Sequence, residues 1–213
     1  MFCMRRTIGS SSLFYLNYKF YIIMIVLGTA HEEKTPGKRS PDGKFREYIY
    51  SRKLCKEVQK RLGERGIDSL IDFEEDNIPG ATNSSQELKL RVKKVNSILN
   101  AIYVSLHVNA SGNTWTNARG LTVHVANNCS VRSERLGQSI YNEAIKGGLQ
   151  GNRSIPYDYL WRNDFYVLKY TKGPAVLVEV AFMTNHEDVE MMLSQEGFSR
   201  IVDTIVNGIE KAI

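Results

Sequence analysis

Short, strongly apolar segments alternate with amphipathic segments along most of this chain, and this alternation constrains the fold more than any other feature. The apolar segments at 22–28, 102–106 and 175–182 each have the length of a buried strand. In the segments 46–64 and 86–99, apolar residues recur with the period of a helix. Strands that alternate with helices are typical of an α/β protein, so we expect one largely parallel, twisted sheet flanked by helices on both faces.

The remaining elements follow from the same reasoning. The length of 213 residues and the hydrophobic content of 42% suit a single large domain with one core. We expect the first strand to end at Gly28, which we interpret as a turn signal. The other predicted elements are a short strand at 67–71, a half-buried strand at 121–125, an extended segment at Phe165–Leu168, and helices at 133–145, 186–195 and 197–211.

The apolar run at 20–27 has two interpretations. It follows Arg5 and Arg6 and precedes Ala30, which gives it the outline of a secretory signal peptide. However, polar residues separate the arginines from the run, and cleavage after Ala30 would remove the strand that positions His31. We therefore favour a buried strand, although secretion through this segment stays open.

A boundary is expected close to this strand. We expect residues 1–23 to form a leader of doubtful order, with Met24 as an alternative initiator, and residues 24–213 to form the functional domain. No stretch approaches the roughly 20 apolar residues that a transmembrane helix needs.

Charge and cysteine content exclude several classes of protein. Three of the 28 basic residues and none of the acidic ones lie in the first 23 positions, so the rest carries 25 basic and 23 acidic side chains. This balance argues against nucleic-acid binding. The widely spaced Cys3, Cys55 and Cys129 form neither a disulfide framework nor a metal knuckle, and they suggest synthesis in a reducing compartment. We interpret Cys55 as a small core residue.

Four polar residues stand where the apolar pattern does not favour them. His31 and His107 each follow a predicted strand, and the carboxyl ends of neighbouring parallel strands meet at one edge of a sheet. Glu47 lies on the apolar stripe of its helix, and Glu179 interrupts the most hydrophobic run of the chain. Taken singly, each histidine could be a hydrogen-bonded structural residue, Glu47 could favour a helix N-terminus, and Glu179 could belong to a buried ion pair.

Their joint placement favours a metal site over these separate explanations. An inward-facing carboxylate needs a charge partner or a metal ion, because an isolated buried charge is costly. Two histidines and one carboxylate are a known ligand set for catalytic zinc, with the fourth position left to water. We assign no metal role to His124 or to His186, which we expect at the surface near a helix start.

Five short motifs follow one another along the chain. Three of them are Ile25-Val-Leu-Gly-Thr-Ala-His31, Arg46-Glu47, and Leu88-Lys-Leu-Arg91 with Asn96. The other two are Ser105-Leu-His107-Val-Asn-Ala110 and Pro174-Ala-Val-Leu-Val-Glu179-Val-Ala-Phe182-Met-Thr-Asn185. Together they resemble the zinc-dependent N-acetylmuramoyl-L-alanine amidases of the amidase-3 type over about residues 23–212, and the last two motifs, in this order and spacing, are highly specific.

The resemblance implies a function and a role for each residue. These enzymes cut peptidoglycan between the lactyl group of muramic acid and the first L-alanine of the stem peptide. Carried over by position, His31, Glu47 and His107 are the expected ligands of one Zn²⁺ per chain, and Glu179 is the expected catalytic carboxylate. Asn109, Arg91 and Arg119 are further candidates for substrate contacts, with a structural or solvated role as the alternative for each.

Two departures from the family pattern concern the substrate loops. Gly28-Thr-Ala-His31-Glu-Glu33 replaces the usual Gly-His-Gly-Gly, so the loop beside the first ligand lacks two glycines. Thr122 stands where many members have Glu. Both changes bear on loop geometry and on stem-peptide preference.

Two other functions stay open at this point. One is a zinc peptidase that shortens stem peptides, and the other is a non-catalytic wall-binding module of the same fold. The expected substrate is peptidoglycan or its muropeptides, so the protein would act on the cell wall, either as a host enzyme or as a phage lysin. The oligomeric state is left open.

Overall fold

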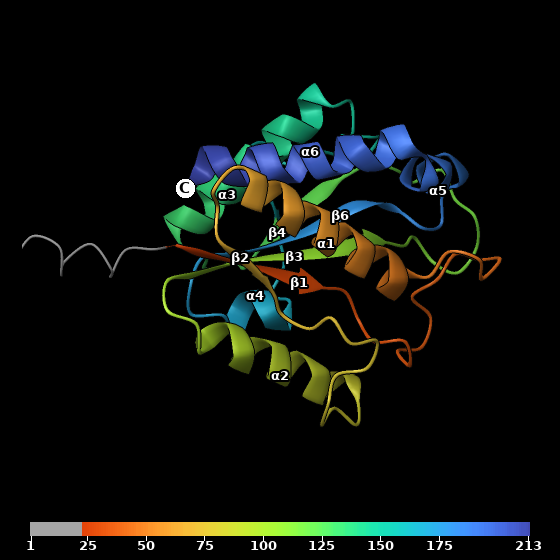
Figure 1. Ribbon diagram of the computed structural model, residues 1–213. Coiled ribbons are helices and arrows are strands. Elements are labelled where there is room, and N and C mark those ends of the chain that lie inside the picture. Colours follow the sequence, from red (N-terminus) through yellow and green to blue (C-terminus); the bar gives the residue numbers. More distant parts are fainter. Residues whose placement is uncertain (1–22) are drawn as a thin grey trace, which may run out of the picture.

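Strands from across the chain form one central sheet in the computed structural model, which describes residues 23–213 (Figure 1). In this range the sheet has six strands in the order β2-β1-β3-β6-β4-β5. All neighbouring strands run parallel except β4 and β6, which are antiparallel. The strands are β1 (Met24–Thr29), β2 (Ser69–Ile71), β3 (Ala101–Asn109), β4 (Thr122–Val125), β5 (Trp161–Arg162) and β6 (Ala175–Phe182).

Helices cover both faces of this sheet. Figure 1 shows α1, α3, α5 and α6 on one face, and α2 and α4 on the other. The arrangement confirms the predicted α/β class with a largely parallel sheet. The helices are α1 (Glu47–Glu64), α2 (Ser84–Asn96), α3 (Val131–Lys146), α4 (Tyr166–Tyr170), α5 (His186–Leu193) and α6 (Gln195–Ala212).

Apolar side chains fill the spaces between these layers. The predicted stripe of α1, formed by Leu54, Val58 and Leu62, is fully buried in the larger core cluster, beneath α1, α3 and α6. Cys55 is buried in the same cluster, as predicted. A smaller cluster beneath α2 and α4 includes Tyr103 of β3. The amphipathic period of these helices therefore places the sheet in the centre of the fold.

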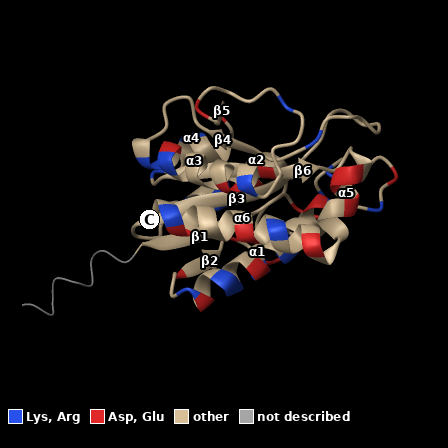
Figure 2. Ribbon diagram, turned by 90° about the horizontal axis from the view of Figure 1, so that it is seen from above, with Lys and Arg blue, Asp and Glu red and all other residues tan. Residues whose placement is uncertain are grey.

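Side-chain caps fix where several helices begin. Asn83, Ser130, Asn185 and Ser194 each accept a hydrogen bond from a backbone N–H in the first turn of the helix that follows. In α5, where acidic residues gather (Figure 2), Asp188 Oδ2 also accepts hydrogen bonds from the backbone N–H of Gly120 and Phe182. These bonds tie the carboxyl end of β6 to the loop that precedes β4.

Our interpretation of Gly28 as a turn signal was wrong. Gly28 lies inside β1, paired with Ser105 of β3, and the strand continues to Thr29. A side chain at this position would overlap the hydroxyl and ring of Tyr103. Glycine is therefore required here by a close approach of a neighbouring aromatic ring, not by a change of chain direction.

The expected extended segment at Phe165–Leu168 was also wrong. Only Phe165 has extended backbone there, and α4 begins at Tyr166. Val167 and Leu168 are buried in the smaller cluster, and the rings of Tyr166 and Tyr170 lie 4.5 Å apart, one helical turn from each other. Packing of this single turn against the sheet outweighs the strand preference of its aromatic and β-branched residues.

Two expectations concern the N-terminal region and membranes. The leader expected over residues 1–23 lies, apart from Ile23, outside the described residues. Within residues 23–213, no helix combines the length and apolar character needed to cross a bilayer.

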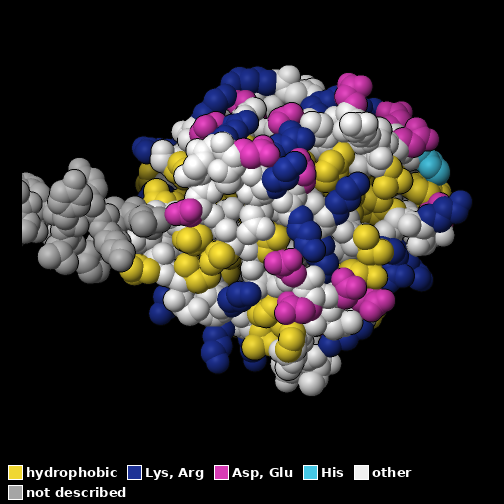
Figure 3. All heavy atoms as spheres, in the orientation of Figure 1, with side chains coloured by type: hydrophobic (Ala, Val, Ile, Leu, Met, Phe, Trp, Pro, Cys, Tyr) yellow, Lys and Arg dark blue, Asp and Glu magenta, His cyan; other side chains and the backbone are white. Residues whose placement is uncertain are grey.

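On the face seen in Figure 3, acidic and basic side chains are interspersed, with hydrophobic side chains among them in small groups.

Candidate metal centre

The two predicted histidine ligands come from neighbouring parallel strands. β1 pairs with β3 as far as Thr29 and Leu106, so His31 in the loop after β1 lies close to His107. Their ring centroids are 5.1 Å apart, with the rings nearly perpendicular. His107 was expected to follow its strand, but it lies within β3, which continues to Asn109 with an irregular register against β6.

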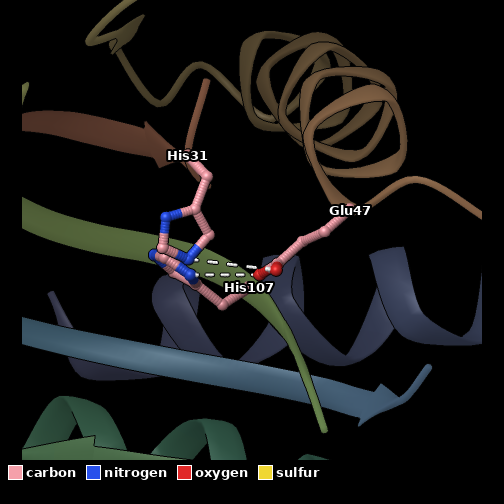
Figure 4. Close-up of side chains that lie close together, drawn as sticks. All are labelled: His31, Glu47 and His107. Carbon is pink, nitrogen blue, oxygen red and sulfur yellow. Dashed lines mark hydrogen bonds and ion pairs between the residues drawn. The ribbon is translucent and has the colours of Figure 1, made fainter. Parts of the chain in front are cut away.

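Glu47 reaches the histidines from the first turn of α1 (Figure 4). Its side chain is 1% exposed, so the prediction of an inward-facing carboxylate is confirmed. Glu47 Oε1 lies 3.2 Å from His107 Nδ1 and accepts a hydrogen bond from the backbone N–H of Val108 at 3.0 Å. Glu47 Oε2 lies 3.9 Å from His31 Nε2. One potential ligand atom from each residue lies within 4.8 Å of the other two, which makes the set a candidate metal site.

Two buried arginines hold the loop that carries His31. The backbone of His31 has φ of 43°, in the left-handed region that few non-glycine residues adopt. Its carbonyl accepts hydrogen bonds from Arg52 Nη2 at 3.1 Å and from Arg91 Nη2 at 3.4 Å. Arg91 is itself paired with Asp72 and Glu87, and all three are almost fully buried. The loop geometry at the first ligand therefore rests on a buried charged network.

The two extra acidic residues of this loop also have defined places. Glu32, which follows His31, is 2% exposed and accepts a hydrogen bond from the backbone N–H of Ile78. It also pairs with Lys34 at 3.4 Å. Glu33 lies at the surface and accepts a hydrogen bond from Tyr48. Contacts to Ile78, Lys34 and Tyr48 therefore hold the two acidic residues in place.

Glu179, on the central strand β6, lies beside the three candidate ligands. It is paired in register with His107 of β3 and with Thr122 of β4. Its Oε2 atom is shielded from solvent and has no hydrogen-bond partner among the described residues. Glu47 Oε2 is likewise buried and without a hydrogen-bond partner there. Both carboxylates thus present a free oxygen in the region where the histidines converge.

A cavity of about 240 Å³ opens beside these residues. His31, His107 and Glu179 line it together with Ser105, whose Oγ lies 3.1 Å from His107 Nε2. The other lining residues are Lys38, Glu87, Leu88, Arg91, Phe165, Tyr166, Val167 and Leu177. The two candidate histidine ligands and Glu179 therefore face one shared, partly enclosed space.

Burial shifts the pKa of all four residues. It lowers the pKa of His31 and of His107 from 6.5 to about 3, so both imidazoles are neutral at pH 7 and have a nitrogen lone pair for a metal ion. Burial also raises the pKa of Glu47. The pKa of Glu179 rises to about 8, first through burial and then through the negative charge of Glu47. A bound cation would oppose both rises, because it stabilises the charged carboxylates.

Of the other predicted residues, only Arg91 lines this cavity. Asn109 accepts a hydrogen bond from the N–H of Ala110, and Arg119 forms an ion pair with Glu187; neither lines the cavity, whereas Arg91 does. His186 is exposed and stacks on Trp115. His124 is buried between Thr122 and Asn163, with hydrogen bonds of 2.9 and 2.8 Å.

Sequence reasoning missed several residues of the cavity wall. Phe165 and Tyr166 were assigned to an extended segment without a functional role, and Lys38 was one of many charged residues in its loop. Their common position in the cavity wall becomes clear only when α4 and the β1–α1 loop are placed beside β6 in the fold. None of them interrupts a sequence pattern in the way that Glu179 does.

The comparison with known proteins agrees with this geometry. The pattern of the N-acetylmuramoyl-L-alanine amidase family, Amidase_3, matches residues 25–211. The chain belongs to this amidase family. The candidate metal site and Glu179 all lie within the matched region, so the resemblance noted in the motifs extends over nearly all of the described chain.

This chain is similar to individual members and relatives of the amidase family, at moderate sequence identity. The uncharacterized protein YqiI of Bacillus subtilis is 29% identical over 159 residues, which is 73% of this chain and 72% of YqiI. The N-acetylmuramoyl-L-alanine amidase LytC of the same organism is 28% identical over 139 residues, or 65% of this chain, and the match spans 25% of LytC. An N-acetylmuramoyl-L-alanine amidase from Clostridium difficile 630 has the same fold, with a TM-score of 0.76 at 19% identity, covering 89% of this chain and 95% of that chain.

Proposed function

We propose that this chain is a zinc-dependent amidase that hydrolyses the amide bond between the lactyl group of N-acetylmuramic acid and the L-alanine of the stem peptide. Membership of the amidase family supports the substrate class. The observation that carries the proposal is the convergence of His31, Glu47 and His107 beside Glu179, with buried carboxylate oxygens that lack partners among the described residues.

The donor set fits zinc. Two neutral imidazoles and one carboxylate are ligands that Zn²⁺ accepts in catalytic sites, and the free Glu47 Oε2 is accounted for if it binds the ion. His31, Glu47 and His107 would hold the metal. When bound, zinc supplies activation of water near neutral pH and polarisation of the scissile carbonyl group.

Glu179 would move the proton. An unstrained amide is a poor electrophile, and its nitrogen must be protonated before it leaves. A carboxylate that takes a proton from the attacking water and delivers it to the alanine nitrogen performs both tasks, with a contribution of typically ~10²–10⁴-fold. Glu179 suits this role because it lies on β6, between two other strands, and its Oε2 has no hydrogen-bond partner among the described residues.

Digestion of purified peptidoglycan tests the proposal. The zinc-loaded protein is incubated with purified cell walls, and the soluble products are identified by mass spectrometry. An amidase releases intact stem peptides and leaves glycan strands without peptide. Shortened stems still attached to muramic acid would indicate a peptidase instead, and the absence of any product would indicate a wall-binding module.

A further inference from the structure

Lys38 lies on the rim of the candidate site in a fixed backbone position. Its carbonyl accepts a hydrogen bond from the N–H of Glu47 at 3.0 Å, so Lys38 is joined directly to one of the metal-ligand candidates. Arg39 and Arg46 form a short antiparallel bridge next to this bond. Lys38 itself has φ of 47°, in the left-handed region. The loop thus holds an exposed lysine at the wall of the cavity that contains Glu179.

The charge of this lysine is not neutralised by the protein. Within the described part of the chain, no carboxylate lies within 4 Å of its ammonium group, and the group has no hydrogen-bond partner. By contrast, Arg91, the other cation that lines the cavity, is paired with both Asp72 and Glu87. Among residues 23–213, Lys38 is therefore the cation of the cavity wall that has no carboxylate partner.

Its positive charge acts on the whole site. Its ammonium group lies close enough to the carboxylates of Glu47 and Glu179 to stabilise their negative charges. With a divalent ion bound, the charges of Glu47 and Glu179 would be balanced by the ion, and Lys38 would remain beside the site as a positive charge without a carboxylate partner among the described residues. Such a site favours an anionic ligand.

Another part of the cavity lining is apolar. It consists of Leu88, Phe165, Tyr166, Val167 and Leu177. A ligand that matches both the apolar part and Lys38 combines a small apolar side chain with a nearby anionic group. In a muramoyl peptide the lactyl carboxyl group is already part of the scissile amide, so the nearest free carboxylate lies on the peptide side. L-Alanine followed by a residue with a free α-carboxylate meets both requirements.

We propose that Lys38 is a specificity-determining residue that binds the α-carboxylate of the second stem-peptide residue. This inference rests on the amidase function proposed above. Stem peptides carry either D-glutamate or its α-amide, D-isoglutamine, at that position. The amide has the same shape and lacks the charge, so Lys38 selects the glutamate form.

The test uses a pair of disaccharide tetrapeptides that differ only in D-glutamate or D-isoglutamine at the second position. Kinetic constants are measured with zinc-loaded wild type, Lys38→Met and Lys44→Met. Lys44 is the matched control because it is an exposed lysine of the same loop that does not line the cavity. We expect wild type and Lys44→Met to prefer the glutamate form by at least ~10-fold in kcat/KM, the effect of one charge-assisted hydrogen bond. In Lys38→Met this preference should disappear through a higher KM for the glutamate form.

Equal cleavage of both substrates by wild type would overturn the inference. So would a loss of kcat in Lys38→Met that is the same for both substrates, because that result would indicate a role in transition-state stabilisation. A parallel calorimetric experiment measures binding of the two tetrapeptides to zinc-loaded Glu179→Gln with and without Lys38→Met. If neither wild type nor any variant cleaves either substrate, the proposed function fails. Preferential binding of the glutamate form that is lost in Lys38→Met would still support the role of Lys38, and equal binding of both forms would overturn it.

Discussion

His107 and Glu179 occupy the same register position on the neighbouring parallel strands β3 and β6. One is a candidate metal ligand and the other has a buried oxygen without a partner among the described residues. Because the two residues are paired in register across neighbouring strands, the separation between His107 and Glu179 is set by the sheet and not by a loop.

The first prediction concerns metal content. We expect wild type to bind one zinc ion per chain and His107→Ala to lose most of it, because one of three protein ligands is removed. Elemental analysis of the purified proteins after dialysis measures this directly. His186→Ala is the control, since His186 is exposed and stacks on Trp115. Full occupancy in His107→Ala would refute the ligand assignment.

The second prediction separates catalysis from structure at Glu179. Glu179→Gln keeps the shape of the side chain but removes the proton acceptor, so turnover should fall by at least ~10²-fold. We expect zinc content and melting temperature to stay close to those of wild type. A variant that loses zinc would make Glu179 a ligand, and one that loses mainly stability would make it part of a structural charge pair.

The third prediction concerns the pH dependence of stability. Burial lowers the pKa of His124 from 6.5 to about 4 in the folded protein, so the unfolded chain binds a proton first as the pH falls. The stabilisation is complete above about pH 6.5 and is lost as the pH falls towards about 4, by up to roughly 3 kcal/mol.

The variant His124→Gln lacks this titration while its amide can still reach Thr122 and Asn163. Denaturant unfolding at several pH values should therefore show wild type losing more stability than the variant between pH 7 and about pH 4. A difference between the two proteins that does not change with pH would contradict the buried, neutral state of His124.

The fourth prediction tests the close approach at Gly28. A methyl group there would overlap the ring of Tyr103, which cannot move freely because its hydroxyl donates to Asp72 at 3.0 Å. We expect Gly28→Ala to lose ~1–3 kcal/mol of unfolding free energy. Gly63→Ala in α1 is the matched control, because nothing lies near its added methyl group, and it should gain up to ~1 kcal/mol from helix propensity. Thermal or denaturant unfolding compares the two, and equal effects would contradict the packing described for β1.

Much of this fold could be predicted from sequence because its pattern is local. The run that contains Glu179 and the stripe of Leu54, Val58 and Leu62 indicate a buried strand and a helix without any knowledge of their neighbours. The convergence of His31 and His107 needed one further assumption, that their strands are adjacent, and the pairing of β1 with β3 confirms it.

The errors and omissions have a non-local cause. Gly28 resembles a turn signal unless Tyr103 is known to lie against it, and α4 resembles a strand unless its packing on the sheet is known. Lys38 cannot be distinguished from Lys34 or Lys44 by sequence, because its role follows from a hydrogen bond to Glu47 and from the absence of a carboxylate beside it among the described residues. Such relationships arise only from the folded arrangement.

The most direct test of the account is to follow the oxygen atom of the attacking water. Cell walls are digested by the zinc-loaded protein in water enriched in heavy oxygen, and the products are separated and weighed. The proposed reaction places the label in the lactyl carboxyl group of N-acetylmuramic acid, while the released stem peptide, with a free L-alanine amino group, carries none. Label in a carboxyl group of a shortened peptide would contradict the account, because the bond cleaved would then lie within the stem.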